Sequence, residues 1–316
     1  MTDTQNEVFK TPVNKIRLFE HGAPGSQNLK LTRKYYTEDM PDGRVKHIVQ
    51  NIADPDIVPY IPDGIGNSTD RQRIPAVLII PGGAFRRLVY NFEGEDVAKW
   101  LNSMGIAAFV LECRLPSDEH DNAEDVPLID AMRAMRVIRG RAQEFGIDEA
   151  KIGVMGFSAG GFMAALLSTA YESDVYADYK YKDEYDKLSA RPDFVVCSYP
   201  VISIDDCIEA GKRYMSEEQV LERISDSKAK ILHKYNPDKL VRPDMPPVFI
   251  CETDDDRTTL SENSVGFYMA ARKAGVSAEL HIFRTGGHGY GCGDDFAQTG
   301  EWKVLFTKWI KSIGII

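Results

Sequence analysis

The chain has 316 residues, 43% of them hydrophobic and 27% charged, which is the usage of an ordinary globular protein. This composition excludes disordered, collagen-like and coiled-coil chains, and we expect residues 1–316 to form a single α/β domain. The formal net charge of −10 repels nucleic-acid phosphates and anionic lipids, so we expect neither nucleic acid nor membrane as a partner.

The five cysteines are odd in number, widely spaced and without a CxxC pair. A disulfide framework or a zinc knuckle is therefore not expected, and a reducing compartment fits this usage best. The N-terminal stretch MTDTQNEVFKTPVNK lacks the apolar segment of a signal peptide, and no run approaches 18 consecutive apolar residues. We therefore expect a cytoplasmic protein.

Residues 1–60 are predicted to form an N-terminal arm followed by edge strands. The first 30 residues are polar and rich in turn-forming residues. After them, the short β-like runs RKYY and KHIVQNI are interrupted by Pro41-Asp42-Gly43 and by further prolines. This pattern favours edge strands or a hairpin beside a larger sheet.

From residue 74 onward, strand-length apolar runs alternate with amphipathic segments of helical length. Runs that are apolar on both faces are typical of a buried parallel sheet. The predicted strands are 75–81, 106–113, 151–157, 193–201, 247–253 and 278–283, and the predicted helices are 93–105, 127–146, 159–172 and 261–275. This alternation predicts an open, mostly parallel sheet with helices on both faces, with the strands ending along one edge.

Residues 202–244 interrupt this alternation. They are polar and helix-forming, and they are longer than a simple crossover between two strands requires. The segment predicts a helical cap inserted near the strand ends.

The strongest motif is Gly156-Phe157-Ser158-Ala159-Gly160, which lies between a predicted strand and a predicted apolar helix. A serine in such a sharp strand-to-helix turn is typical of a nucleophile elbow, where flanking glycines make room for neighbouring backbone. The start of the helix favours negative charge, as on a developing oxyanion. Ser158 is therefore a candidate nucleophile.

A serine nucleophile requires a base and a group that orients the base. Among the six histidines, His288 alone lies in a glycine-flanked loop, TGGHGYG, directly after the last predicted strand. The strand before that one runs into Asp254, Asp255 and Asp256, any of which is a candidate for the acid. The three aspartates lack the alternating spacing of a calcium loop.

A second glycine motif, Pro81-Gly82-Gly83-Ala84-Phe85, follows the first strand of the predicted parallel sheet. Small residues at this edge allow backbone N–H groups to turn toward the serine. Together with the amide of Ala159, they are candidates to hold an oxyanion.

These motifs, in the order Ser…Asp…His, resemble those of the α/β-hydrolase superfamily. The chain is most similar to bacterial carboxylesterases with an HGGG-type oxyanion loop, which are related to hormone-sensitive lipase and include acetylxylan esterases. The resemblance covers the stretch from Ile74 to Gly291 through PGGAF, GFSAGG, ETDDD and GGHGYG. Residues 1–60 and 202–244 match only loosely.

The resemblance implies an α/β-hydrolase fold in which Ser158 is the nucleophile and His288 the base. It selects Asp256 as the acid, with Asp255 as the alternative, and it implies oxyanion donors from Gly83, Ala84 and Ala159. Glu93 also matches a family position, which we interpret as a buried structural polar residue.

The function implied is a serine carboxylesterase for short-chain acyl esters, including acetylated carbohydrates, that needs no metal or organic cofactor. The partner expected is a small-molecule ester. Alternatives are a serine peptidase of the prolyl-oligopeptidase type and a catalytically silent binding module. A homo-oligomer formed through exposed edge strands is compatible with the sequence.

Overall fold

The computed structural model describes residues 9, 12–65, 73–177, 183–216, 218–220, 229–293 and 298–316. Within these residues, the central sheet has eight strands in the order β1-β4-β7-β5-β8-β9-β10-β11. Their bounds are β1 (Ile16–Arg17), β4 (Asp56–Tyr60), β7 (Ala107–Glu112), β5 (Ile74–Ile80), β8 (Ile147–Phe157), β9 (Val195–Ser198), β10 (Val248–Thr253) and β11 (Ala278–Phe283). The six strands from β7 to β11 in this order are parallel, whereas β4 and β1 are added antiparallel at one edge.

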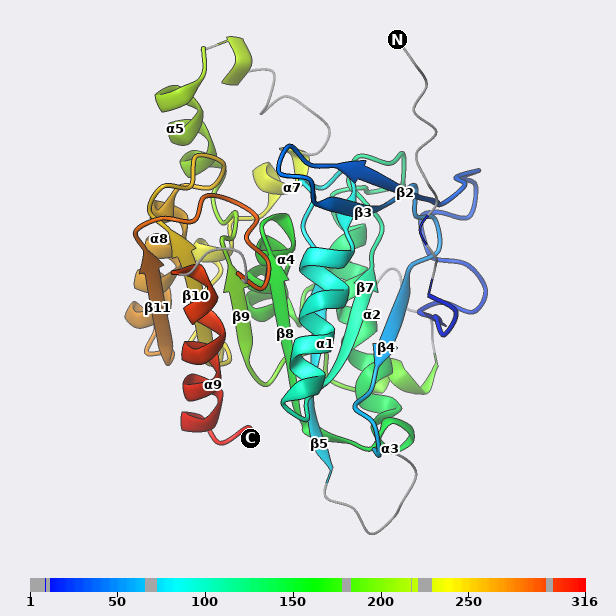
Figure 1. Ribbon diagram of the computed structural model, residues 1–316. Helices are drawn as coiled ribbons and strands as arrows, with labels where there is room; N and C mark the ends of the chain where they lie inside the picture. The colour runs from blue at the N-terminus through cyan, green and yellow to red at the C-terminus, as the bar shows by residue number, and fades with distance from the viewer. Residues whose placement is uncertain are drawn as a thin grey trace.

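Helices cover both faces of this sheet, with α1 and α9 in front and α2 and α4 behind in the view of Figure 1. The helices beside the sheet are α1 (Asp96–Ser103), α2 (Val126–Gly140), α3 (Ala142–Phe145), α4 (Ala159–Ala170), α8 (Ser261–Lys273) and α9 (Trp302–Ser312). Short helical turns are η1 (Asn91–Glu95), η2 (Asp174–Tyr176), η3 (Glu184–Lys187), η4 (Pro237–Lys239) and η5 (Thr299–Glu301). The predicted open, mostly parallel sheet between two helical layers is confirmed.

The centre of the core is α4, which packs on β8 and β9 and contacts α2, a second helix on the same face of the sheet. Its residues are buried from Ala159 to Thr169, which explains why the sequence there is apolar all round. The predicted helix 127–146 is divided into α2 and α3 at Arg141, where the backbone leaves helical geometry. The turn directly before this buried helix contains Ser158.

A second sheet of three antiparallel strands consists of β2 (Lys34–Asp39), β3 (Val45–Gln50) and β6 (Leu88–Val89). The turn at Asp42 and Gly43 joins β2 to β3, and Arg44 N–H donates back to the Asp42 carboxylate at 3.0 Å. The hairpin expected from this sequence does form, but in a separate sheet. It lies over the end of the central sheet from which the loops after β8, β10 and β11 emerge (Figure 1).

The segment 202–244 contains α5 (Ile204–Tyr214), α7 (Ala229–Lys234) and η4, while its residues 217 and 221–228 lie outside the described residues. Both helices lie at the same end of the sheet as the β2–β3 hairpin (Figure 1). A cap role for this segment and the assignment of the whole chain to one domain stay predictions. Nowhere in the described part of the chain is a helix both long and apolar enough to cross a lipid bilayer.

Candidate active site

Ser158 lies in the turn between β8 and α4, with φ 53° and ψ −118°. This positive φ is strained for a residue with a side chain. The flanking glycines make the turn possible. A Cβ atom on Gly156 would lie 1.9 Å from the Gly160 carbonyl oxygen, and one on Gly160 would lie 1.9 Å from the Ile80 carbonyl oxygen. The backbone at this turn is therefore packed so closely that a side chain is excluded at Gly156 and Gly160. Ser158 lies between them, directly after the end of β8.

The imidazole of His288 lies between Ser158 and Asp256. Its Nε2 is 2.9 Å from the Ser158 hydroxyl, and its Nδ1 is 2.7 Å from the Asp256 carboxylate. In this arrangement Nδ1–H donates to the carboxylate and Nε2 is left to accept the serine proton. The structure thus brings together three side chains from the loops after β8, β10 and β11, which the sequence placed at one edge.

The structure separates the roles of the adjacent aspartates. Asp256 is 2% exposed, and its carboxylate also accepts hydrogen bonds from the amides of Thr258 and Thr259 at 2.7 and 2.9 Å. Asp255 points to the other side, where one oxygen accepts from Gly286 N–H and Gly287 N–H at 2.9 and 2.8 Å. Asp256 therefore contacts the histidine, and Asp255 fixes the backbone of the loop that carries it.

Electrostatics keep Asp256 ionised. Burial by itself would raise its pKa, but the hydrogen bond and charge of His288, together with the amides of Thr259 and Thr258, lower the pKa below the ordinary value of 3.8. A charged carboxylate at this position stabilises the imidazolium that forms when His288 takes a proton.

The candidate oxyanion donors lie beside the serine hydroxyl. Gly83 and Ala84 both have positive φ, 139° and 56°, and a Cβ on Gly83 would lie 2.1 Å from the Arg87 carbonyl oxygen. Ala159 is the first residue of α4, so its N–H has no carbonyl within the helix. Within the described part of the chain, none of these three amides donates to a protein acceptor. They are available to an external oxygen.

Glu93 connects the oxyanion loop (residues 81–85) with the loop that carries His288 (residues 285–291), a role that the sequence did not reveal. Its carboxylate is 5% exposed and accepts from Gly82 N–H at 2.8 Å and from the Tyr199 hydroxyl at 2.9 Å. The same hydroxyl accepts from Gly291 N–H at 3.1 Å, and the Tyr199 ring meets the His288 ring edge-on with centroids 5.0 Å apart. Burial raises the pKa of Glu93. The charge of His288 and the hydrogen bonds from Tyr199 and Gly82 act in the opposite direction and reduce this rise.

A cavity of about 250 Å³ opens beside Ser158 and His288. The β2–β3 hairpin forms part of its wall through Met40, Arg44 and Lys46. Nothing in the sequence indicates that these three residues belong to the site, since they lie more than a hundred positions before the serine in a segment with the pattern of edge strands. The remaining lining residues are Gly83, Ala84, Arg87, Val89, Phe92, Glu93, Thr258 and Gly289.

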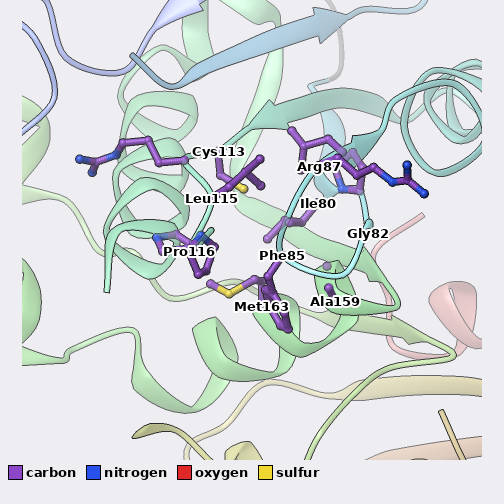
Figure 2. Close-up of a pocket in the computed structure, with 14 residues that line it drawn as sticks. Ile80, Gly82, Phe85, Arg87, Cys113, Leu115, Pro116, Ala159 and Met163 are labelled. Atoms are coloured by element: carbon purple, nitrogen blue, oxygen red, sulfur yellow. The ribbon is translucent and has the colours of Figure 1, made fainter. Parts of the chain in front are cut away.

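A smaller cavity of about 20 Å³ lies next to the oxyanion loop, where Phe85 and Met163 face Ala159 (Figure 2). Its walls are largely apolar, and its volume is close to that of a single water molecule. A long acyl chain does not fit there without displacing side chains.

The described residues contain no group of three or more histidine, cysteine or acidic side chains placed to hold a metal ion. The chemistry available in the described site is that of a hydroxyl, an imidazole, a carboxylate and backbone amides.

The profile of the BD-FAE family matches residues 65–270, a range that contains Ser158 and Asp256. The chain belongs to this family. Among curated proteins, it is 31% identical over 240 residues to an acetylxylan esterase of Xylanibacter ruminicola, covering 75% of this chain and 45% of that protein. It is also 31% identical over 227 residues to endo-1,4-beta-xylanase B of Butyrivibrio fibrisolvens, covering 72% of this chain and 34% of that protein. The chain thus spans less than half the length of these curated relatives.

Solved structures confirm the α/β-hydrolase fold. An acetyl ester-xyloside bifunctional hydrolase from Caldicellulosiruptor lactoaceticus is 37% identical, with a TM-score of 0.66 over 83% of this chain and 89% of that one. The carboxylesterase Cest-2923 from Lactobacillus plantarum is 20% identical, with a TM-score of 0.67 over 90% of this chain and 99% of that one. The resemblance to bacterial carboxylesterases is therefore confirmed for the family and the fold.

Proposed function

We propose that the protein is a serine carboxylesterase that hydrolyses short-chain acyl esters, with acetylated carbohydrates as its substrate class. The observation that carries this proposal is the continuous chain of hydrogen bonds from the Ser158 hydroxyl through His288 to Asp256, at 2.9 and 2.7 Å. The Ser158 hydroxyl, at one end of this chain, lies beside a cavity. It also lies beside three backbone amides that lack protein acceptors among the described residues.

The reaction begins when the Ser158 hydroxyl attacks the ester carbonyl and His288 Nε2 takes its proton. The oxyanion that forms accepts hydrogen bonds from the amides of Gly83, Ala84 and Ala159, while Asp256 stabilises the imidazolium. His288 then gives the proton to the leaving alcohol, and an acyl-serine remains. A water molecule, activated by the same imidazole, attacks the acyl-serine, releases the carboxylic acid and restores the hydroxyl.

Two relatives favour acetyl groups on xylan-type sugars as the substrate. The 37% identical structure is of an acetyl ester-xyloside hydrolase, and one of the two curated relatives above is an acetylxylan esterase. The small cavity beside Ala159 is consistent with a short acyl group. We therefore expect acetyl esters to be hydrolysed faster than esters of long fatty acids.

The cysteines favour the cytoplasm as the location, because all five are free thiols. Fractionation of cells that produce the protein tests this location. Binding assays test the expected lack of nucleic-acid and membrane partners, and sedimentation tests whether the protein forms a homo-oligomer.

The function is tested by comparing wild type with Ser158→Ala on p-nitrophenyl esters of increasing chain length and on acetylated xylo-oligosaccharides. We expect kcat to fall roughly 10⁴–10⁶-fold in the variant, with circular dichroism unchanged, since only one oxygen is removed. Retained turnover by the variant would remove Ser158 from the mechanism. Faster hydrolysis of aminoacyl p-nitroanilides than of esters would instead favour a peptidase.

A further inference from the structure

Three basic side chains line the cavity beside the reactive serine: Arg44 and Lys46 from the β2–β3 hairpin, and Arg87 from the segment between the oxyanion loop and β6. The chain as a whole carries a net charge of −10, so this concentration of cations is local. Residues on two separate segments place their charges on one wall. The described part of the active-site cavity is therefore more basic than the rest of the molecule.

Acidic neighbours compensate part of this charge. Arg44 pairs with Asp42 at 2.8 Å, and Arg87 pairs with Glu38. Glu38 also lies opposite Lys46 in the β2–β3 register. Among the described residues, however, no carboxylate comes within ion-pair distance of the Lys46 ammonium group. The wall thus keeps one cationic group that can accept an anionic partner from the cavity.

Lys46 lines the same cavity as Ser158 and His288. Burial raises the pKa of Glu93, and the positive charges of His288 and Lys46 both act on that carboxyl in the opposite direction. Since His288 protonates the departing alcohol in the proposed reaction, the alcohol lies on the His288 side. His288 and Gly289 line the same cavity as Lys46.

We propose that this cavity binds the alcohol part of the ester through a carboxylate, so that the preferred substrates are acyl esters of acidic sugars of the uronate class. The proposal rests on the esterase function and narrows its substrate. Lys46 supplies a compact positive charge that can pair with this carboxylate. The cavity volume of about 250 Å³ is slightly below the volume of sites for drug-sized ligands. A cavity of this size suits a single sugar unit.

The test uses two acetyl esters of nearly the same shape, 4-acetoxybenzoate and 4-acetoxybenzamide, which differ in a negative charge on the alcohol part. For the wild type we expect kcat/KM to be about tenfold higher for the anionic ester, mainly through a lower KM. This preference is expected to decline as sodium chloride is raised from about 0.02 M to 0.5 M, because salt screens partly exposed charges. The salt series requires no variant.

Lys46→Met removes the charge and keeps the aliphatic stem. We expect it to lower the ratio of kcat/KM for 4-acetoxybenzoate to kcat/KM for 4-acetoxybenzamide about tenfold. Lys34→Met is the matched control, because Lys34 is exposed on β2 of the same hairpin and does not line the cavity. It makes the same change in net charge and is expected to leave the ratio unchanged.

Equal kcat/KM values for the two esters in the wild type, or equal losses in Lys46→Met and Lys34→Met, would overturn the proposal while leaving the esterase function intact. Failure of the wild type to hydrolyse either ester would instead contradict the esterase function. A third outcome would also overturn the proposal: the enzyme prefers mono-(4-nitrophenyl) succinate to 4-nitrophenyl butyrate but does not prefer 4-acetoxybenzoate to 4-acetoxybenzamide. The cavity would then bind a carboxylate on the acyl part of the ester and not one on the alcohol part.

Discussion

The loops that follow β8, β10 and β11 and the three-stranded sheet β2-β3-β6 build the same cavity in different ways. Each loop holds its candidate catalytic side chain by local backbone geometry. At Ser158, for example, separations of 1.9 Å exclude a Cβ atom on Gly156 and Gly160. The sheet supplies Met40, Arg44 and Lys46, none of which lies in a recognisable motif. Local geometry fixes the groups that we propose to react, whereas the wall that we propose to select the substrate depends on where a hairpin distant in the sequence packs.

A large effect is expected within the loops, at Asp256 but not at the adjacent Asp255. Asp256→Asn keeps the shape of the side chain but removes the charge that orients and stabilises His288. We expect kcat to fall roughly 10³–10⁴-fold. Asp255→Asn is the matched control, because its amide oxygen still accepts from Gly286 N–H and Gly287 N–H. Its kcat is expected to stay within about threefold of wild type in p-nitrophenyl acetate assays.

Equal losses in the two aspartate variants would contradict the division of roles between them. A large loss in Asp255→Asn alone would mean that the loop backbone, not the buried carboxylate, controls the histidine.

The sequence predicted the central sheet and the loops well because both are encoded locally. Apolar runs mark strands buried on two faces, and the glycines around Ser158 mark a turn in which bulk is excluded. The glycines on either side of His288 mark positions of positive φ, 62° at Gly287 and 78° at Gly289. The choice between Asp255 and Asp256 was not encoded in this way, because neighbouring residues at a strand end point in different directions according to the hydrogen bonds of the following turn. Here the amides of Thr258 and Thr259 decide that direction.

The hairpin was predicted as secondary structure but not as part of the site. Its alternating, partly polar strands indicate a half-exposed sheet, and nothing in that pattern identifies the surface that it covers. The expected burial of Glu93 is confirmed, but the sequence did not indicate which groups its carboxylate would contact. Its function follows only from its two partners, Gly82 and Tyr199, which lie on different segments.

A variant of the hairpin tests whether it shapes specificity without affecting the chemistry. Met40→Trp adds bulk at the cavity wall. We expect kcat/KM for acetylated xylo-oligosaccharides to fall about tenfold and that for p-nitrophenyl acetate to change less than about threefold, since the smaller alcohol occupies less of the cavity. Equal losses on both substrates would show that the hairpin supports the reacting groups themselves.

The smallest effect is expected at Glu93, which lines the cavity that the loops and the hairpin share. It concerns the pH dependence of the free energy of unfolding. Since burial raises the pKa of Glu93 above its ordinary value of 4.5, the folded protein binds this proton more tightly than the unfolded chain does. The stability contributed by the proton is fully present below the unfolded-state pKa and is lost as pH rises through the higher folded-state pKa.

Glu93→Gln removes this titration and keeps an oxygen that can accept from Gly82 N–H. We therefore expect the free energy of unfolding of the wild type to decrease relative to that of the variant as pH rises from about 4 to 8. Urea unfolding of both proteins across this range measures the difference. A difference that does not vary with pH, or one that varies in the opposite direction, would contradict a raised pKa at Glu93.

The most direct test of the account is covalent labelling of the folded protein with a fluorophosphonate, followed by mass spectrometry of its peptides. We expect one adduct per chain, located on the Ser158 hydroxyl, and a much slower reaction in the His288→Ala variant. Labelling at another residue while Ser158 remains unmodified, or no labelling of the folded protein at all, would contradict the claim that this serine is an activated nucleophile.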